Sequence, residues 1–197
     1  MSSDVRVCFL GDSFVAGVGD PQCLGWAGRL AVLAHRRGTP LTAYNLGIRR
    51  DTSADVLARW RAECTPRLPA GCDARLVLSF GVNDTVQGLP AAESTGRLRT
   101  LLTDAAAWPR LVVGPPPVGD EPVNRALAAL DETFAEACRD LRVPYVSTLP
   151  ALVRDPVWMR EVRDGDGAHP GAAGYEALTR LVAPAWARWL DAGPLTP

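Results

Sequence analysis

Residues 6–19 read Arg-Val-Cys-Phe-Leu-Gly-Asp-Ser-Phe-Val-Ala-Gly-Val-Gly. The first five residues form a short apolar run of the kind that makes a buried strand, and the glycine-rich segment 11–19 predicts a sharp turn at the end of that strand. A helical pattern over residues 25–37 follows the turn and ends at Gly38. The chain therefore opens with a strand, a turn and a helix, which is the first half of a βαβ unit.

The same alternation continues to the C-terminus. Further strands are predicted at residues 41–46, 75–80, 110–113 and 143–147, and further helices at residues 53–64, 91–107, 122–141 and about 171–190. Five strands separated by helices predict right-handed crossovers and a parallel sheet that is covered on both faces. The predicted fold class is α/β: a three-layer α/β/α sandwich with a flavodoxin-like five-stranded parallel sheet.

Length and composition limit the organisation of the chain. The 197 residues contain no repeat, linker or low-complexity stretch, so one domain over residues 1–197 is predicted. No apolar run reaches the ~18 residues of a membrane-spanning helix, and the N-terminus lacks the pattern of a secretory signal. The net charge of −1 gives no reason to expect a nucleic-acid partner.

Several classes of site are excluded by missing residues. Every basic residue apart from two histidines is arginine, so a Schiff-base lysine and a Gly-Lys-Ser/Thr phosphate loop are absent. No Gly-x-Gly-x-x-Gly motif indicates a dinucleotide, and the cysteines and histidines do not have metal-ligand spacing. No metal or organic cofactor is expected. The odd number of cysteines, five, favours a reduced, cytoplasmic protein, although the spacing leaves a Cys64–Cys72 bridge open.

The predicted strand ends carry the chemically informative residues, because ligands of parallel α/β sheets bind beyond the carboxyl ends of the strands. Ser13 follows the first strand, Gly47 follows the second and Asn83 follows the third. Near the C-terminus, residues 166–169 read Asp-Gly-Ala-His. These segments offer a nucleophile, hydrogen-bond donors for an oxyanion, and a base with a carboxylate beside it.

The spacing of the last segment suits a catalytic triad. An aspartate three residues before a histidine can hold the imidazole and stabilise its charged form, so Asp166 is preferred over Asp164 as the partner of His169. His35, the other histidine, lies at a predicted helix C-terminus, where the helix dipole explains it. The order Ser…Asp…His matches the α/β-hydrolases, but the chain has no Gly-x-Ser-x-Gly elbow.

With these four blocks in this order, the chain resembles the GDSL, or SGNH, hydrolase family. The family has a Gly-Asp-Ser block, a block with a key glycine, a Gly-x-Asn-Asp block and an Asp-x-x-His block, and the resemblance spans residues 6 to about 190. The resemblance implies the SGNH hydrolase fold. It also implies a catalytic triad of Ser13, Asp166 and His169, and an oxyanion hole formed by the Ser13 N–H, Gly47 and Asn83. Two positions depart from the pattern: Phe14 replaces a leucine, and Arg50 stands where many members have a second glycine.

The resemblance implies a serine esterase or acylhydrolase that forms an acyl-enzyme. Small or short-to-medium acyl esters, or thioesters, are the expected substrates. A carbohydrate O-acetylesterase or acetyltransferase is the nearest alternative, and a catalytically silent binding module is a more distant one. The expected partner is thus a small-molecule ester, while the sequence does not indicate an oligomeric state.

Four other charged residues near the strand ends are interpreted as structural, as solvated or as binding the substrate. Asp12 and Asp84 are interpreted as structural, because short carboxylates in tight turns accept local backbone N–H groups. Arg49 and Arg50 are interpreted either as holding an anionic group of the substrate or as two solvated arginines.

Trp158 precedes the Asp-x-x-His block directly, together with Met159. Their large apolar side chains are interpreted either as lining the acyl site or as part of the core.

Overall fold

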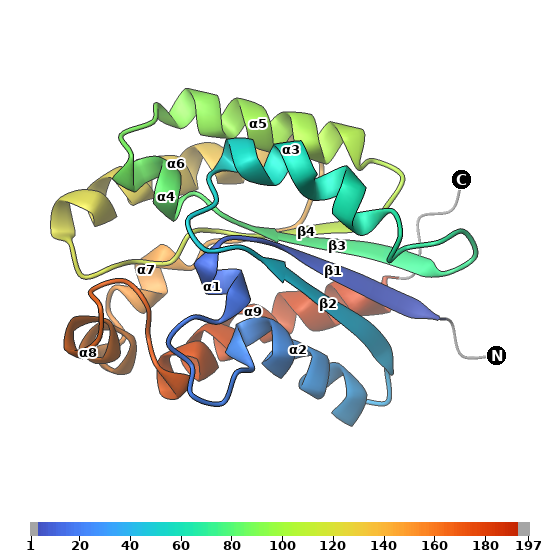
Figure 1. The fold of residues 1–197 in the computed structure, drawn as a ribbon, viewed down its shortest axis with the longest axis horizontal. Helices are drawn as coiled ribbons and strands as arrows, with labels where there is room; N and C mark the ends of the chain where they lie inside the picture. The colour runs from blue at the N-terminus through green and yellow to red at the C-terminus, as the bar shows by residue number, and fades with distance from the viewer. Residues whose placement is uncertain (1–3, 193–197) are drawn as a thin grey trace.

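The computed structural model describes residues 4–192, which form a five-stranded parallel sheet between two layers of helices (Figure 1). The strands lie in the order β2-β1-β3-β4-β5, which is the flavodoxin-like order. They are β1 (Val5–Gly11), β2 (Leu41–Gly47), β3 (Asp73–Ser79), β4 (Arg110–Val113) and β5 (Tyr145–Val146). The predicted fold class is therefore confirmed.

Strand β1 shows why the sheet is buried on both sides. Val7 and Phe9 pack into one apolar cluster, whereas Cys8 and Leu10 pack into the other. Successive side chains of a strand point to opposite faces, so a strand with apolar residues at every position must be covered twice. The first cluster lies under α2 and α9, and the second lies under α3, α5 and α6.

The long helices agree with the sequence to within about three residues. They are α2 (Gly25–Arg36), α3 (Ser53–Cys64), α5 (Ala91–Asp104), α6 (Glu121–Asp140) and α9 (Ala172–Asp191). Figure 1 shows α3 and α5 over one face of the sheet and α2 and α9 over the other. Two of them begin at a side-chain cap: the capping box of Thr52 and Asp55 starts α3, and Asp120 caps α6.

Four short helices were not predicted. They are α1 (Ser13–Ala16), α4 (Val82–Val86), α7 (Leu149–Leu152) and α8 (Pro156–Asp164). The first three have four or five residues, too few to show a helical hydrophobic period. Strand β5 is also shorter than predicted, with two residues instead of five.

The carboxyl ends of the central strands meet at one level. Gly11 of β1 pairs with Gly47 of β2 on one side and with Ser79 of β3 on the other. Gly47 must be glycine here, because a Cβ atom would lie 2.2 Å from the backbone nitrogen of Ala16 in α1. The register thus brings the segments after β1, β2 and β3 together at one edge of the sheet.

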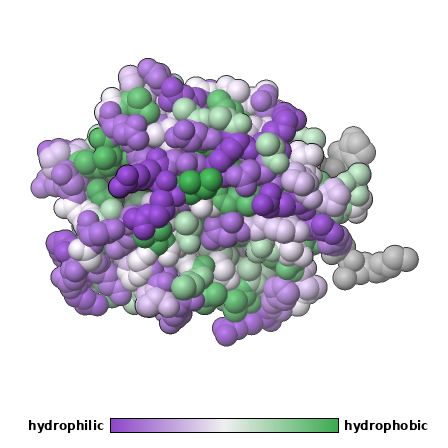
Figure 2. All heavy atoms as spheres, viewed as in Figure 1, coloured by the Kyte–Doolittle hydropathy of each residue, from purple (hydrophilic) through white to green (hydrophobic). Residues whose placement is uncertain are grey.

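Within residues 4–192, no helix is long and apolar enough to cross a membrane. The same residues contain no group of three or more histidine, cysteine, aspartate or glutamate side chains that could hold a metal ion. The hydropathy of one face is mixed, with small apolar groups among hydrophilic residues (Figure 2).

Candidate active site

Ser13 lies at the start of α1, directly beyond the end of β1. The side chain of Asp12 caps this helix, because its Oδ1 accepts a hydrogen bond of 2.9 Å from the backbone N–H of Phe14. Ser13 is 6% exposed, and its own N–H has no acceptor among the residues described. The N–H of Ser13 is therefore available to a ligand.

His169 connects Ser13 to Asp166. Its Nε2 lies 2.7 Å from Oγ of Ser13, and its Nδ1 lies 2.8 Å from Oδ2 of Asp166. The other oxygen of Asp166 accepts the backbone N–H groups of Ala168 and His169, at 3.0 and 2.8 Å. The structure brings these three predicted residues into one hydrogen-bonded chain, whereas Asp164 has no hydrogen bond to His169.

The environment of Asp166 favours its ionised form. Desolvation alone would raise the pKa of this carboxyl group, but hydrogen bonds from the backbone and ring of His169 and from the backbone of Ala168 lower the pKa to about 2. Asp166 is thus a carboxylate at neutral pH, able to orient the Nδ1–H of His169 and to stabilise a positive charge on the ring.

Aromatic side chains pack next to His169. The ring of Phe14 lies 4.9 Å from the imidazole, centroid to centroid, and Trp158 stacks against Phe14 with 6.4 Å between the ring centroids. Trp158 is fully buried, and its indole N–H donates to the carbonyl of Pro117. Of the two predicted interpretations of Trp158, the structure supports the core. Met159 is partly buried and packs against the same cluster.

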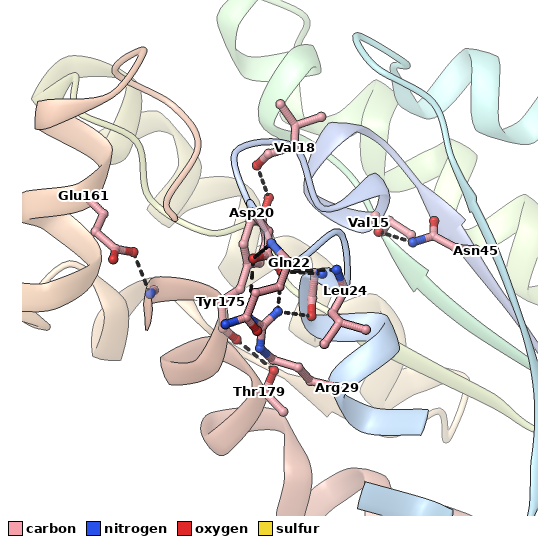
Figure 3. A network of polar contacts seen from close by, with 12 residues as sticks. Val15, Val18, Asp20, Gln22, Leu24, Arg29, Asn45, Glu161, Tyr175 and Thr179 are labelled. Carbon is pink, nitrogen blue, oxygen red and sulfur yellow. Dashed lines mark hydrogen bonds and ion pairs between the residues drawn. The ribbon is translucent and has the colours of Figure 1, made fainter. Parts of the chain in front are cut away.

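A polar network fixes the loop that follows α1 (Figure 3). Tyr175 of α9 donates a hydrogen bond of 2.8 Å to the carbonyl of Val18. Asp20 accepts the N–H groups of Gln22 and Gly25 and pairs with Arg29 of α2. The turn bearing Ser13 is therefore anchored to both helices on that face of the sheet.

Asn83 lies on α4, beyond the end of β3. Its Nδ2 donates to the carbonyl of Asp51 at 2.8 Å, which uses one of the two amide hydrogens and leaves the other for a ligand. The neighbouring Asp84 is completely buried and accepts hydrogen bonds from Ser53 and Ser94. Asp84 is structural, as predicted, but its partners come from α3 and α5 instead of its own turn.

The structure contradicts the predicted role of Gly47 as an oxyanion donor. The N–H of Gly47 donates to Oδ1 of Asn45 at 3.0 Å, and the residue is covered by α1. Instead, Arg50 lies in the turn three residues further on, with a left-handed φ of 71° and an N–H that has no acceptor among residues 4–192. Gly47 is required for close packing, and its N–H is already used.

A cavity of about 380 Å³ opens in front of these groups. Its walls include Ser13, Asn83 and His169, the two arginines Arg49 and Arg50, and apolar side chains from three segments: Val82 and Val86 of α4, Val118 and Val123 around the start of α6, and Ala168. A larger hollow of about 520 Å³ lies between α2 and α9 and contains none of the predicted site residues. The smaller cavity is the candidate active site, because Ser13, His169 and Asp166 all line it.

The remaining predicted residues lie outside the cavity. His35 contacts the backbone of Leu41 at 3.0 Å, at the C-terminal end of α2. All five cysteines are free thiols, so Cys64 and Cys72 are not bridged. Asp12 keeps one oxygen buried without a hydrogen-bond partner, and desolvation raises its pKa to about 7.

Comparison with solved structures shows the same arrangement of strands and helices. A lipase/acylhydrolase from Enterococcus faecalis matches with a TM-score of 0.78 at 20% identity, over 98% of this chain and 100% of that chain. TesA matches with a TM-score of 0.78 at 24% identity, over 93% and 99% of the two chains. Axe2, an acetylxylan esterase from Geobacillus stearothermophilus, matches with a TM-score of 0.72 at 17% identity, over 96% of each chain.

The fold is thus that of the SGNH hydrolases. The model of the GDSL-like lipase/acylhydrolase family matches residues 9–177, which include all four blocks. The chain belongs to this family and is a carboxylic ester hydrolase. No curated protein sequence matches the chain.

Proposed function

We propose that the chain is a serine esterase for small or short-to-medium acyl esters or thioesters, with Ser13 as nucleophile, His169 as base and Asp166 as the carboxylate that orients His169. One observation carries the proposal: Ser13, His169 and Asp166 are joined by hydrogen bonds of 2.7 and 2.8 Å at the wall of a cavity. A serine hydroxyl is a weak nucleophile until a neighbouring base takes its proton, which this geometry allows.

The reaction then has two halves. Oγ of Ser13 attacks the carbonyl carbon while its proton passes to Nε2 of His169, and that proton goes to the leaving alcohol or thiol as the ester bond breaks. Water next attacks the acyl-enzyme and gives a proton to His169. Ser13 regains this proton as the acid leaves.

The oxyanion of each tetrahedral intermediate needs donors that are free and fixed. We assign this role to the backbone N–H groups of Ser13 and Arg50 and to the side-chain amide of Asn83. Arg50 replaces Gly47 in this set because its N–H is free, and because it shares the cavity with Ser13 and Asn83. The left-handed backbone of Arg50 is a conformation that a functional constraint can maintain.

Hydrolysis of 4-nitrophenyl esters from acetate to decanoate, with matched acyl thioesters beside them, tests the proposal, and Ser13→Ala is the blank. Rates that fall with chain length support an acetyl or other small acyl group, and acetylated sugars then become the substrates to try, with an acceptor alcohol present to detect acetyl transfer. A maximum at medium length supports longer acyl esters or thioesters. Equal rates for wild type and Ser13→Ala at every length would overturn the esterase and leave a binding module.

We also keep a single domain over residues 1–197 and a cytoplasmic location as predictions. The free thiols agree with a reducing compartment. Residues 1–3 and 193–197 of the predicted domain lie outside the described residues.

A further inference from the structure

Two guanidinium groups, those of Arg49 and Arg50, lie at the candidate active site. Arg49 and Arg50 both line the cavity that contains Ser13 and His169, and both are exposed. Neither forms an ion pair with any residue from 4 to 192. In contrast, the nearby Arg59 is tied to Asp51 and to the carbonyl of Gly11. The charges of Arg49 and Arg50 are therefore free to meet a ligand.

Arg50 occupies a backbone conformation that disfavours a side chain. It lies in the turn closed by the hydrogen bond of 3.3 Å from the N–H of Asp51 to the carbonyl of Ile48, with φ at 71°. Glycine takes this conformation without a steric cost, whereas arginine does not. A strained residue at the wall of a reactive cavity indicates that its side chain has a use there.

The charge distribution around His169 is asymmetric. A second hollow of about 430 Å³ lies on another side of His169 and is lined by the carboxylates of Glu161 and Asp164, besides that of Asp166, which lines both hollows. These carboxylates repel an anion. The cavity beside Arg49 and Arg50 also has two acidic wall residues: Asp120, which caps α6, and Asp166, which is bound to His169. An anionic group is thus better accommodated beside Arg49 and Arg50, because the lining of the second hollow includes carboxylates and no arginine.

We propose that the ester substrate carries an anionic group, a carboxylate or a phosphate, that Arg49 and Arg50 bind while Ser13 attacks the ester carbonyl. Guanidinium groups suit this task because their N–H donors match the oxygens of a carboxylate or phosphate in pairs. The surrounding valines of the cavity accommodate the uncharged part of the substrate. This inference rests on the proposed esterase function and narrows its substrate class.

Pairs of esters that differ in one negative charge test whether the substrate carries an anionic group. The anionic member of the first pair is mono-4-nitrophenyl adipate, with the charge on the acyl side, and the neutral member is its methyl ester. The second pair places the charge on the leaving group, as 4-acetoxybenzoate against its methyl ester. The quantity measured is the ratio of kcat/KM for the anionic ester to that for the neutral ester, so that any general change in activity cancels.

We expect a ratio of about 10 or more for wild type in one of the two pairs, which also shows where the charge lies. Arg49→Gln should lower this ratio about tenfold, the factor for one lost charge-assisted hydrogen bond. Arg50→Gly, which retains the backbone N–H, should lower it similarly. NaCl at 1 M should lower it in wild type, because the Debye length falls to about 3 Å.

Arg139→Gln is the matched control. It removes the same charge from an exposed site on α6, about 28 Å along the helix axis from the end nearest the cavity. Its ratio should equal that of wild type. A wild-type ratio near one in both pairs, or a ratio unchanged by Arg49→Gln and Arg50→Gly, would overturn the inference. Hydrolysis of the neutral esters that still depends on Ser13 would leave the esterase itself intact.

Discussion

The side chain of Asn83 is well suited to test the oxyanion hole, because replacing it should affect catalysis much more than folding. One amide hydrogen of Asn83 is donated to the carbonyl of Asp51, and the other has no acceptor among the described residues, although Asn83 lines the cavity. Since the short helix α4 is itself held by the buried Asp84, the Asn83 side chain contributes little else to the fold.

Asn83→Ala should therefore lower kcat on 4-nitrophenyl acetate by about 10²–10³, the usual cost of one lost oxyanion donor. KM and the melting temperature should change little. Thr85→Ala is the control, because Thr85 lies on the same helix and donates only to the carbonyl of Gly81. If Thr85→Ala were as inactive as Asn83→Ala, the loss would come from the helix instead of the amide.

The first element of the site, α1, depends on a carboxyl group that is costly to ionise. Asp12 is buried, one of its oxygens has no partner, and desolvation raises its pKa from 3.8 to about 7. The N-cap of the helix that carries Ser13 is thus held by a group that is largely protonated in the folded protein below pH 7.

This raised pKa has a consequence for stability. Between about pH 4 and pH 7 the unfolded chain has lost the Asp12 proton while the folded chain keeps it, so the Asp12 contribution to stability falls as pH rises. Asp12→Asn cannot ionise. Its free energy of unfolding, relative to wild type, should rise by about 1.4 kcal/mol per pH unit across this window and level off above it.

Urea unfolding at pH 5, 6, 7 and 8 measures this slope. Asp55→Asn is the control, because hydrogen bonds from Thr52 lower the pKa of Asp55, which stays ionised in both states over this range. The stability of Asp55→Asn relative to wild type should not depend on pH. A flat difference for Asp12→Asn as well would contradict a protonated Asp12.

The elements at the sheet edge are joined by a second buried carboxylate. Asp84 of α4 accepts the backbone N–H and hydroxyl of Ser53 at the start of α3, and the hydroxyl of Ser94 on α5 at 2.7 Å. One side chain thus fixes the positions of α3, α4 and α5 relative to one another next to the cavity.

Asp84→Ala should destabilise the protein by about 3–5 kcal/mol, because the buried N–H and hydroxyl of Ser53 and the hydroxyl of Ser94 would lose their acceptor. The midpoint of urea unfolding measures this, with the exposed Asp104→Ala at the end of α5 as the control. A loss below about 1 kcal/mol would show that water replaces the carboxylate. In that case the buried network would not be what positions α4.

On the scale of the whole molecule, a buried ion pair joins the sheet to the C-terminal helix. Arg75 of β3 is 2% exposed, pairs with Asp73 at 2.8 Å, and donates at 2.7 Å to the carbonyl of Trp189 in α9. Asp4 and Arg6 repeat the same spacing at the start of β1, but there the pair is exposed to solvent.

Arg75→Met should cost about 3–5 kcal/mol, whereas Arg6→Met should cost less than about 1 kcal/mol, because only the first leaves a carboxylate buried without its partner. For a chain of this length the difference corresponds to roughly 5–15 °C in melting temperature. The double variant Arg75→Met, Asp73→Leu should recover part of the loss. No recovery would mean that the bond to Trp189 dominates.

Local patterns in the sequence predicted most of the architecture. The alternation of apolar strands with long amphipathic helices predicted the layers, and all five strands agree with the structure to within two residues at each end. Asp166 and His169 were also predictable as partners, because three residues of a single turn join them. Short-range signals suffice wherever the contact spans only a few residues.

The amino-acid sequence by itself therefore determined the order of the elements, the apolar faces of the sheet and the short-range Asp166–His169 contact. Apart from the Ser13–His169 pair, which the family resemblance already implied, the tertiary structure alone decided which groups meet across long separations. It places Ser13 against His169 across 156 residues, uses the N–H of Gly47 for Asn45, and turns Arg50 into the cavity with a left-handed backbone. These contacts depend on the register of parallel strands and on the close packing of α1 against β2, neither of which leaves a pattern in the residues between them.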